Sequence, residues 1–394
     1  MRPTPHRRAA AIRIAALLLL IVASAACARE TALDLGKAEK VADGVLLYRL
    51  NDPSLLDPVG AVAVQILRLD PAKVDLRCVL AQERPVALET VQDMASRRHA
   101  IAAINAGFFN IKNGDPVGLL KVDGELVSDM PTSRGAVGLI RGPDNPVKLL
   151  FDRVSATVQV TFQRGGETFA ANIDGVDTTR ARSKLMLYTP RYGANSDTAD
   201  TGVEWQLAGP GGVLHVASRR PNAGKTPIPR DGAVLSFGGT VLPSALEALD
   251  MDQSVSIETT FLARLGTNTA QWHRANDIVS GAGLLVYGGQ PMQDWTDEQL
   301  RAGFNTERHP RTMIGTSKGG IIWMVTVDGR QPDISVGMTF AELQKLAVGL
   351  KLEYALNLDG GGSTTMVVNG TIVNHPSDQA GPRKVSDGIV VIRR

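Results

Sequence analysis

Short apolar segments separated by turn residues make up most of the chain. Many have the length and the Val, Ile and Leu content of β-strands, and Asn, Asp, Gly or Pro residues lie between them. The pattern predicts strands at residues 45–50, 62–69, 74–81, 100–104, 321–327, 354–358 and 385–392. Short strands also dominate between about residues 150 and 270. We therefore expect a strand-rich α/β mixed (α+β) fold, with mixed sheets and a few helices.

Helical spacing of apolar residues is confined to a few segments. Residues 339–350 give the clearest signal, because Thr339 and Glu342 have the spacing of a capping box ahead of an apolar stripe. Residues 86–99 also show helical spacing, and residues 296–302 have the length of a short helix. Asn369-Gly370, by contrast, lies between two apolar runs and predicts a two-residue hairpin turn.

Residues 1–27 have the pattern of an export signal. Four arginines precede the mostly apolar residues 14–26, a run too short to span a bilayer comfortably. Small residues then lead to Cys27, so the segment is either a cleaved signal peptide or a lipoprotein signal that tethers the protein to a membrane through Cys27. We expect an exported protein, in the periplasm or outside the cell.

The charge balance changes when this segment is set aside. The whole chain has 42 basic and 40 acidic residues, and residues 1–27 hold four arginines and no acid, which leaves 38 against 40. No basic stripe interleaved with aromatic residues is present, so the sequence gives no indication of a nucleic-acid partner. Residues 28–97 read as a strand-rich N-terminal segment that packs on the core.

The candidate chemistry centres on residues 357–366, with the sequence NLDGGGSTTM. An apolar strand there ends at Asp359, and three glycines follow, which let backbone N–H groups approach a ligand closely. Taken alone, this is either a glycine-rich turn with a solvated Asp or part of a binding site. A phosphate-binding P-loop is excluded, because no Lys follows the glycines and the next residues favour a strand.

Asp328 and Asp359 share one local pattern, since each follows an apolar strand and precedes glycine. If their strands are neighbours joined by the helix at 339–350, both carboxylates emerge at the same sheet edge. Glycoside cleavage uses such acidic residues, and Arg311 with the glycine N–H groups can hold an anion such as phosphate. The alternative is that both Asp residues only cap turns.

Several segments together resemble the phosphodiester glycosidase family. They share short motifs that occur in order from about residue 98 to the C-terminus. These are AINAGFF at 103–109, LYTPRYG at 187–193, HPRTMIG at 309–315, VDGR at 327–330, GMT at 337–339, NLDGGGSTTM at 357–366 and RKVSD at 383–387. The resemblance implies one catalytic domain over residues 98–394, with a strand-rich middle section at about 150–270.

The resemblance also implies an activity, the hydrolysis of the bond between a sugar anomeric carbon and a phosphodiester. The expected substrates are GlcNAc-1-phosphodiester-like groups in envelope or exopolysaccharide glycans. On this reading Asp359 acts on the sugar side, as nucleophile or cation stabiliser, and Asp328 or Glu307 is the second acid. The expected substrate-binding residues are Asn105, Phe108, Phe109, His309, Arg311, Arg330, Gly360, Gly361, Gly362, Ser363 and Thr364.

Two other functions stay open at this point. One is a glycan-binding envelope protein without turnover, and the other is a glycoside hydrolase that acts on a polysaccharide without phosphate. The sequence requires no cofactor. Zinc is poorly supported because no HxxxH or HExxH pattern occurs. An Asp with loop carbonyls can bind Ca²⁺ or Mg²⁺ through oxygen alone, so the sequence leaves a metal at this site undecided.

Overall fold

The computed structural model describes residues 33–129, 132–209 and 213–394. The expected signal at 1–27, with Cys27, lies outside these residues. Within the described ranges no helix is long and apolar enough to cross a membrane. The strand-rich mixed fold is confirmed: the chain forms two large sheets and two small ones, with four short α-helices among the described residues.

An eight-stranded sheet carries Asp359 just beyond one of its central strands. The order across it is β1 (Glu39–Ala42), β2 (Val45–Leu50), β3 (Val64–Leu69), β23 (Ile322–Val327), β22 (Arg311–Ser317), β24 (Leu352–Asn357), β20 (Leu284–Tyr287) and β21 (Gln290–Pro291). Because β3 pairs with β23, the N-terminal segment is built into the same sheet as the C-terminal part of the chain.

The expected pairing of the two Asp-bearing strands is wrong in one respect. β22 lies between β23 and β24 and runs antiparallel to both. The two strands are therefore parallel but not neighbours, and the helix α4 (Phe340–Gly349) connects them across the intervening strand. Their C-terminal ends still reach the same edge of the sheet, because strands of the same direction end on the same side.

Helix α4 forms as its sequence predicts. The Thr339 side chain accepts a hydrogen bond from the Glu342 N–H at 3.2 Å, and the Glu342 carboxylate accepts one from the Thr339 N–H at 2.9 Å. Its apolar stripe packs into a core cluster beneath the sheet. The short helix expected at 296–302 is instead a single 3₁₀ turn, η4 (Thr296–Glu298), because Gln299 takes a left-handed φ of 51° that ends it.

A five-stranded sheet packs beside the first and supplies the second wall of the site. Its order is β26 (Thr371–Ile372), β25 (Met366–Val368), β5 (Ala102–Asn105), β27 (Asp387–Arg393) and β4 (Val74–Leu80). The predicted hairpin is confirmed, since β25 and β26 pair through Val368 and Thr371 around Asn369-Gly370. Helix α1 (Val91–Arg97) covers this sheet and begins after Thr90, later than the predicted segment 86–99.

The middle of the chain forms a twelve-stranded sheet. Eleven strands follow the order β13 (Gly175–Val176), β14 (Leu185–Tyr188), β17 (Gly232–Phe237), β15 (Val203–Ala208), β16 (Leu214–Pro221), β18 (Ser254–Ala263), β11 (Lys148–Arg164), β10 (Arg134–Ile140), β19 (Asp277–Ser280), β8 (Leu120–Val122) and β9 (Glu125–Ser128), and β12 (Glu167–Ile173) pairs with β11. β9 contacts β13, so the sheet curls into a nearly closed barrel.

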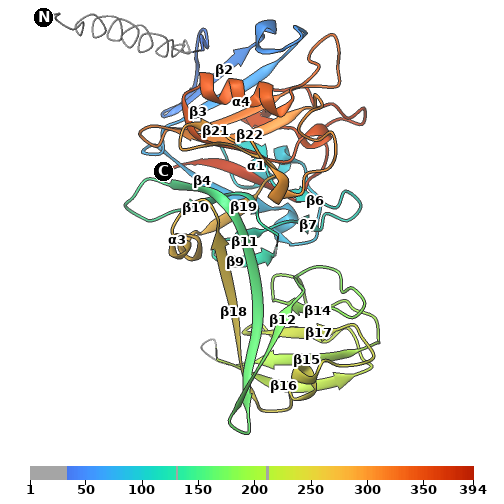
Figure 1. The fold of residues 1–394 in the computed structure, drawn as a ribbon. Helices are drawn as coiled ribbons and strands as arrows, with labels where there is room; N and C mark the ends of the chain where they lie inside the picture. Colours follow the sequence, from blue (N-terminus) through green and yellow to red (C-terminus); the bar gives the residue numbers. More distant parts are fainter. Residues whose placement is uncertain (1–32, 130–131, 210–212) are drawn as a thin grey trace, which may run out of the picture.

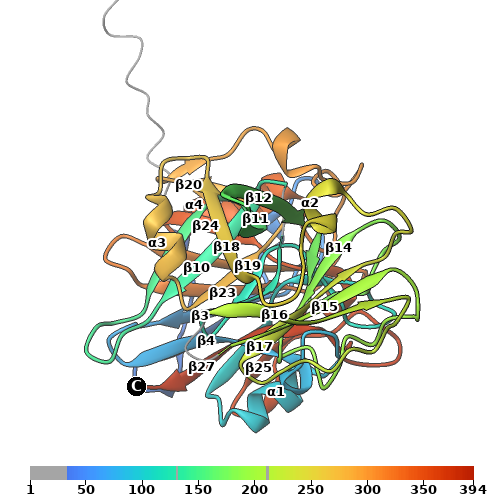
Figure 2. The ribbon, with the colours of Figure 1, turned by 90° about the horizontal axis from the view of Figure 1, so that it is seen from below.

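This sheet extends away from the rest of the molecule. The strands β12–β17 and the far ends of β11 and β18 form a lobe below the body (Figure 1). From below, β14, β15 and β16 of the lobe lie in front of the body (Figure 2). The remaining elements are α2 (Ser244–Glu247), α3 (Thr269–Arg274), the pair β6 (Phe108–Phe109) and β7 (Pro116–Val117), and the 3₁₀ turns η1 (Pro53–Leu55), η2 (Ala81–Glu83) and η5 (Gly361–Ser363).

Candidate functional site

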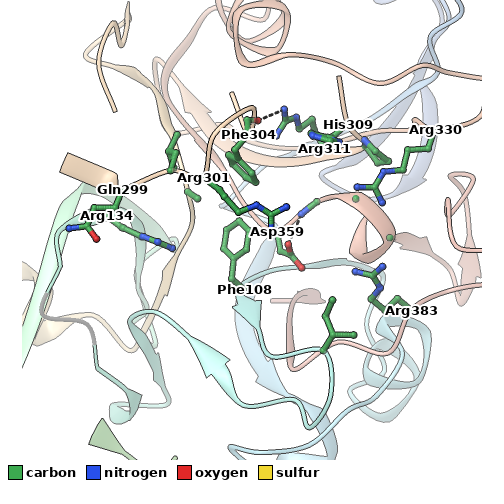
Figure 3. Close-up of a pocket in the computed structure, with 17 residues that line it drawn as sticks. Phe108, Arg134, Gln299, Arg301, Phe304, His309, Arg311, Arg330, Asp359 and Arg383 are labelled. Atoms are coloured by element: carbon green, nitrogen blue, oxygen red, sulfur yellow. Dashed lines mark hydrogen bonds between the residues drawn. The ribbon is translucent and has the colours of Figure 1, made fainter. Parts of the chain in front are cut away.

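A cavity of about 630 Å³ opens beside Asp359, where the eight-stranded and five-stranded sheets meet the loop after η4. Its lining combines one carboxylate with many basic groups (Figure 3). The charged and polar side chains that line it are Asp359, Arg134, Arg301, Arg311, Arg330, Arg383, His309 and Gln299. Five arginines around one carboxylate form a site suited to an anionic ligand.

Asp359 is held from behind by Asn105, at the end of β5. The Asn105 amide donates to the carbonyl oxygen of Asp359 at 2.7 Å, and its own oxygen accepts from the Thr312 hydroxyl and the Thr365 N–H. Asn105 is buried and does not line the cavity. This predicted substrate-binding residue therefore lies behind Asp359 and holds its backbone.

The electrostatic setting of Asp359 is unusual for a carboxylate. Burial raises the pKa of Asp359 to about 6, against the opposing effects of the Ser363 hydroxyl, the Gly360 N–H and the Arg383 charge. The Gly360 N–H donates to Asp359 Oδ1 at 2.9 Å. At neutral pH the side chain is therefore mostly ionised, but it is a stronger base than an ordinary aspartate.

The glycine triplet leaves room for two arginine side chains. Gly361 has a φ of +60°, and a Cβ atom there would lie 3.0 Å from the Arg330 guanidinium. A Cβ atom at Gly362 would overlap the guanidinium of Arg383, which donates to Asp378 at 2.8 and 3.1 Å. Bare backbone at these positions therefore lets both cations approach the cavity.

The backbone of the triplet is less available than the sequence suggests. The Gly361 N–H donates to the carbonyl of Pro310, and the N–H groups of Ser363 and Thr364 donate within the loop. Gly360 is already bound to Asp359. Within residues 360–364, the Gly362 N–H alone has no hydrogen-bond partner among the described residues, so one backbone donor and not five is free of partners within the protein. Ser363 and Thr364 are buried beneath the cavity.

Arg311 lines the cavity, but several of its donors bond within the protein. It is 1% exposed, and it donates to the carbonyl oxygens of Met338, Phe304 and Glu307 at 2.8–2.9 Å. Its guanidinium also lies 5.2 Å from the ring centre of Phe304 and 4.8 Å from that of Phe340. Burial, aided by the Arg330 charge, lowers the pKa of Arg311 to about 10. Arg311 thus fixes the wall of the cavity.

The structure does not bring Asp328 into the cavity. Its side chain is fully buried and accepts hydrogen bonds from Gln65, Asn374 and His375. These bonds tie the end of β23 to the segment after β26, so the predicted second acid lies in a buried hydrogen-bond network outside the cavity lining. The His375 ring nitrogen Nδ1 lies 3.1 Å from Asp328 Oδ2.

Glu307 and His309 lie together at the rim. Glu307 is exposed and outside the cavity lining, and its carboxylate is 3.4 Å from His309 Nε2. His309 does line the cavity, and burial together with the charges of Arg311 and Arg330 lowers its pKa. The imidazole is therefore neutral at neutral pH and can accept or donate a hydrogen bond there.

Of the two predicted phenylalanines, one reaches the cavity. Phe108 lines it and packs against Phe304, with ring centres 6.1 Å apart and a tilt of 59°. Phe109 points the other way and packs with the cluster beneath α1, as expected for adjacent residues on a strand. The Phe108–Phe304 pair gives the cavity an apolar floor.

Several residues that line the cavity are not marked by any motif in the sequence. Arg134, Gln299 and Arg301 come from the start of β10 and the loop after η4, and no local pattern marks them. Arg383 stands in the RKVSD segment that the family resemblance already contained. Asp387 of the same segment is buried behind the site, where it accepts from the Gly107 N–H at 2.6 Å, and burial raises its pKa.

Within the described residues, no group of three or more His, Cys, Asp or Glu side chains gathers in a way that could hold a metal ion.

Comparison with known proteins identifies a protein family that matches part of the chain. Residues 207–392 match the family model described as phosphodiester glycosidase. The bovine N-acetylglucosamine-1-phosphodiester alpha-N-acetylglucosaminidase is 34% identical over 87 residues, which is 21% of this chain and 16% of the bovine protein. The human enzyme of the same name matches equally, at 34% over 87 residues. The match thus spans about a sixth of the length of these relatives.

Solved structures extend the likeness to the whole fold. A hypothetical protein from Synechocystis matches with a TM-score of 0.74 and 22% identity, over 91% of this chain and 64% of that one. A protein from Burkholderia pseudomallei matches with a TM-score of 0.71 and 23% identity, over 85% of this chain and 74% of that one. At this identity the two structures support the fold alone.

Proposed function

Because the chain belongs to the phosphodiester glycosidase family, we propose that it hydrolyses the bond between the anomeric carbon of a sugar and a phosphodiester oxygen. The observation that carries this proposal is the cavity in which Asp359 faces a set of arginines. A substrate that combines a sugar with a phosphate needs both an apolar floor and a cationic wall. Phe108 and Phe304 supply the first, and Arg330 and Arg383 supply the second.

The net reaction places few demands on proton transfer. Water adds to the anomeric carbon and releases one proton to solvent. The bond from that carbon to the phosphate oxygen breaks with its electron pair on the oxygen, and the phosphodiester leaves as a phosphate monoester. That leaving group keeps its negative charge on phosphate oxygens, so it needs less protonation than a sugar alkoxide. The site must then stabilise positive charge on the sugar and hold the departing phosphate.

Asp359 and the arginines have different roles in this reaction. The ionised Asp359 lies on the sugar side, where it acts as nucleophile or stabilises the oxocarbenium-like transition state. Arg330, Arg383 and the Gly362 N–H hold the phosphate on the other side of the reacting bond. Arg311 and Asn105 are positioning residues, because they fix the cavity wall and the backbone of Asp359.

The test compares two substrates. The first is the methyl phosphodiester of GlcNAc 1-phosphate, and the second is an aryl GlcNAc glycoside without phosphate. We expect GlcNAc release from the phosphodiester and little from the aryl glycoside. Turnover of the aryl glycoside alone would favour a hydrolase of non-phosphorylated glycans. Glycan binding without turnover of either would favour a binding protein.

We further propose that the protein acts outside the cytoplasm on envelope or exopolysaccharide glycans. Residues 1–27 support export, and Cys27 supports a lipid tether that holds the protein at a membrane. Fractionation of cells that express the full chain tests this. A lipid tether predicts membrane association that Cys27→Ser removes. Recovery of the wild-type protein in the cytoplasm with residues 1–27 intact would contradict export.

A further inference from the structure

The basic groups of the cavity lie on two sides of Asp359 (Figure 3). On one side Arg330 and Arg383 lie by the glycine triplet, and we call these the glycine-side cations. On the other side Arg134 lies beside Gln299, and Arg301 extends from the same loop toward the centre of the cavity. We call Arg134 and Arg301 the loop-side cations. A single phosphate held at the glycines leaves this second set unexplained.

A buried carboxylate anchors the loop and the strand that carry the loop-side cations. Glu298 is fully buried, and it accepts hydrogen bonds from the N–H groups of Gly135, Gly283 and Leu284 at 2.8–3.1 Å. Its carbonyl oxygen accepts from Arg134 Nε at 3.1 Å. These bonds fix the loop that carries Arg301 against the strand that begins with Arg134.

The positive charge at this end is not neutralised by the protein. The Arg301 side chain is exposed and has no hydrogen-bond or acidic partner among the described residues, and the Arg134 side chain bonds only to a backbone carbonyl. The acid that anchors the loop, Glu298, is itself paired with Arg153 at 3.1 Å and turned away from the cavity. Two guanidinium groups therefore face the cavity with free donors.

A sugar on the aromatic floor would lie between the two sets. If its 1-phosphate is held by the glycine-side cations, as the proposed function requires, its other substituents point toward the loop-side cations. Guanidinium groups favour carboxylate or phosphate partners over neutral hydroxyls.

We propose that Arg134 and Arg301 form a second anion subsite, and that the preferred substrate is a glycosyl phosphodiester whose sugar carries a further negative charge. This inference rests on the proposed function. Two sources supply such a sugar: a chain whose sugars are joined by phosphodiesters, so that each sugar carries phosphate on both sides, and a glycan built from sugar acids. The shared chemistry is an anionic group on the sugar itself.

The experiment uses three probes that differ only on the sugar. They are the methyl phosphodiester of GlcNAc 1-phosphate, its 6-phosphorylated form, and the form with a carboxylate at carbon 6. We expect kcat/KM for one charged probe to exceed that for the uncharged sugar by about tenfold or more, since charge-assisted bonds are the stronger ones. The preferred probe identifies the source, phosphate or carboxylate.

Variants connect the preference to the residues. Arg134→Gln and Arg301→Gln should each lower the ratio of kcat/KM between the charged and uncharged probes, and the double variant should bring it near one. Arg301→Lys keeps a charge and should retain part of the ratio. Arg274→Gln, an exposed arginine of α3, is the matched control and should leave it unchanged. Equal rates for all probes, or a preference that survives the double variant, would overturn the subsite.

The outcome stays separable from the proposed function. If no probe is turned over, the proposed function fails, and the subsite is then tested by calorimetry on Asp359→Asn. GlcNAc 1,6-bisphosphate should bind about tenfold more tightly than GlcNAc 1-phosphate, and Arg134→Gln with Arg301→Gln should abolish the difference. Equal affinities would refute the subsite by this route as well.

Discussion

At the scale of the residue, the proposed function depends on one carboxylate in a cationic cavity. Asp359 is the one acid among the described lining residues, and burial makes it more basic than an ordinary aspartate. The glycines after it leave room for Arg330 and Arg383, so its neighbours in sequence determine its neighbours in space.

The raised pKa predicts the pH dependence of the reaction. Asp359 works as an anion in either proposed role, so kcat/KM should increase as the pH rises through about 6 and level off above it. A pH–rate profile with the methyl phosphodiester of GlcNAc 1-phosphate measures this. A rate that instead declines above pH 6 would mean that Asp359 acts as an acid, and an inflection near its ordinary value would mean that burial does not shift it.

Asp328 shows why residue-level patterns can mislead. Asp328 and Asp359 both follow a buried strand and precede glycine, but Asp328 comes one residue after β23 and Asp359 comes two residues after β24. Successive residues of extended chain point to opposite sides, so one carboxylate enters the cavity and the other enters the interior. The sequence shows the pattern but not where each strand ends.

At the scale of the element, local signals predicted local structure well. The capping box of α4 and the Asn369-Gly370 turn were both identifiable, because their hydrogen bonds join residues within a few positions. The position of β22 between β23 and β24 was not, because strand pairing is decided by contacts that are distant in sequence. The same limit hid the loop after η4, which contributes Gln299 and Arg301 to the cavity while Glu298 anchors it from behind.

The α4 cap gives a quantitative prediction. Thr339→Ala should lower the free energy of unfolding by about 1 kcal/mol, because the Glu342 N–H loses its acceptor at the start of the helix. Thr339→Ser, which keeps the hydroxyl, is the matched control and should lose much less. Urea denaturation of the three proteins provides the comparison. Equal losses for Ala and Ser would show that the cap hydrogen bond contributes little.

At the scale of the whole molecule, the site collects residues from most of the chain. The eight-stranded sheet, the five-stranded sheet and one end of the twelve-stranded sheet come together there. Only this arrangement brings together Phe108, Arg134, the loop after η4, Arg330 and Arg383. The resemblance pointed to the glycine triplet and to the segment with Arg383. It gave no reason to choose Arg134 or Arg301, since isolated arginines in loops are usually solvated.

The lobe carries its own titrating group. Asp177 is buried beside β14, and burial raises its pKa to about 7, although the Thr189 N–H and hydroxyl donate to it. Its native pKa exceeds the unfolded value, so its contribution to stability is full below about pH 4 and is lost as the pH rises to about 7. Asp177→Asn should therefore reduce the melting temperature less at pH 8 than at pH 5. A penalty that is larger at pH 8 would contradict this assignment.

The most direct test of the central claim is the turnover of the methyl phosphodiester of GlcNAc 1-phosphate by the wild-type protein and by Asp359→Asn. We expect the variant to keep nearly the same melting temperature and to lose at least about a hundredfold in kcat/KM. Asp144→Asn, in an exposed loop, should keep full activity. Full activity of a folded Asp359→Asn protein would contradict the account.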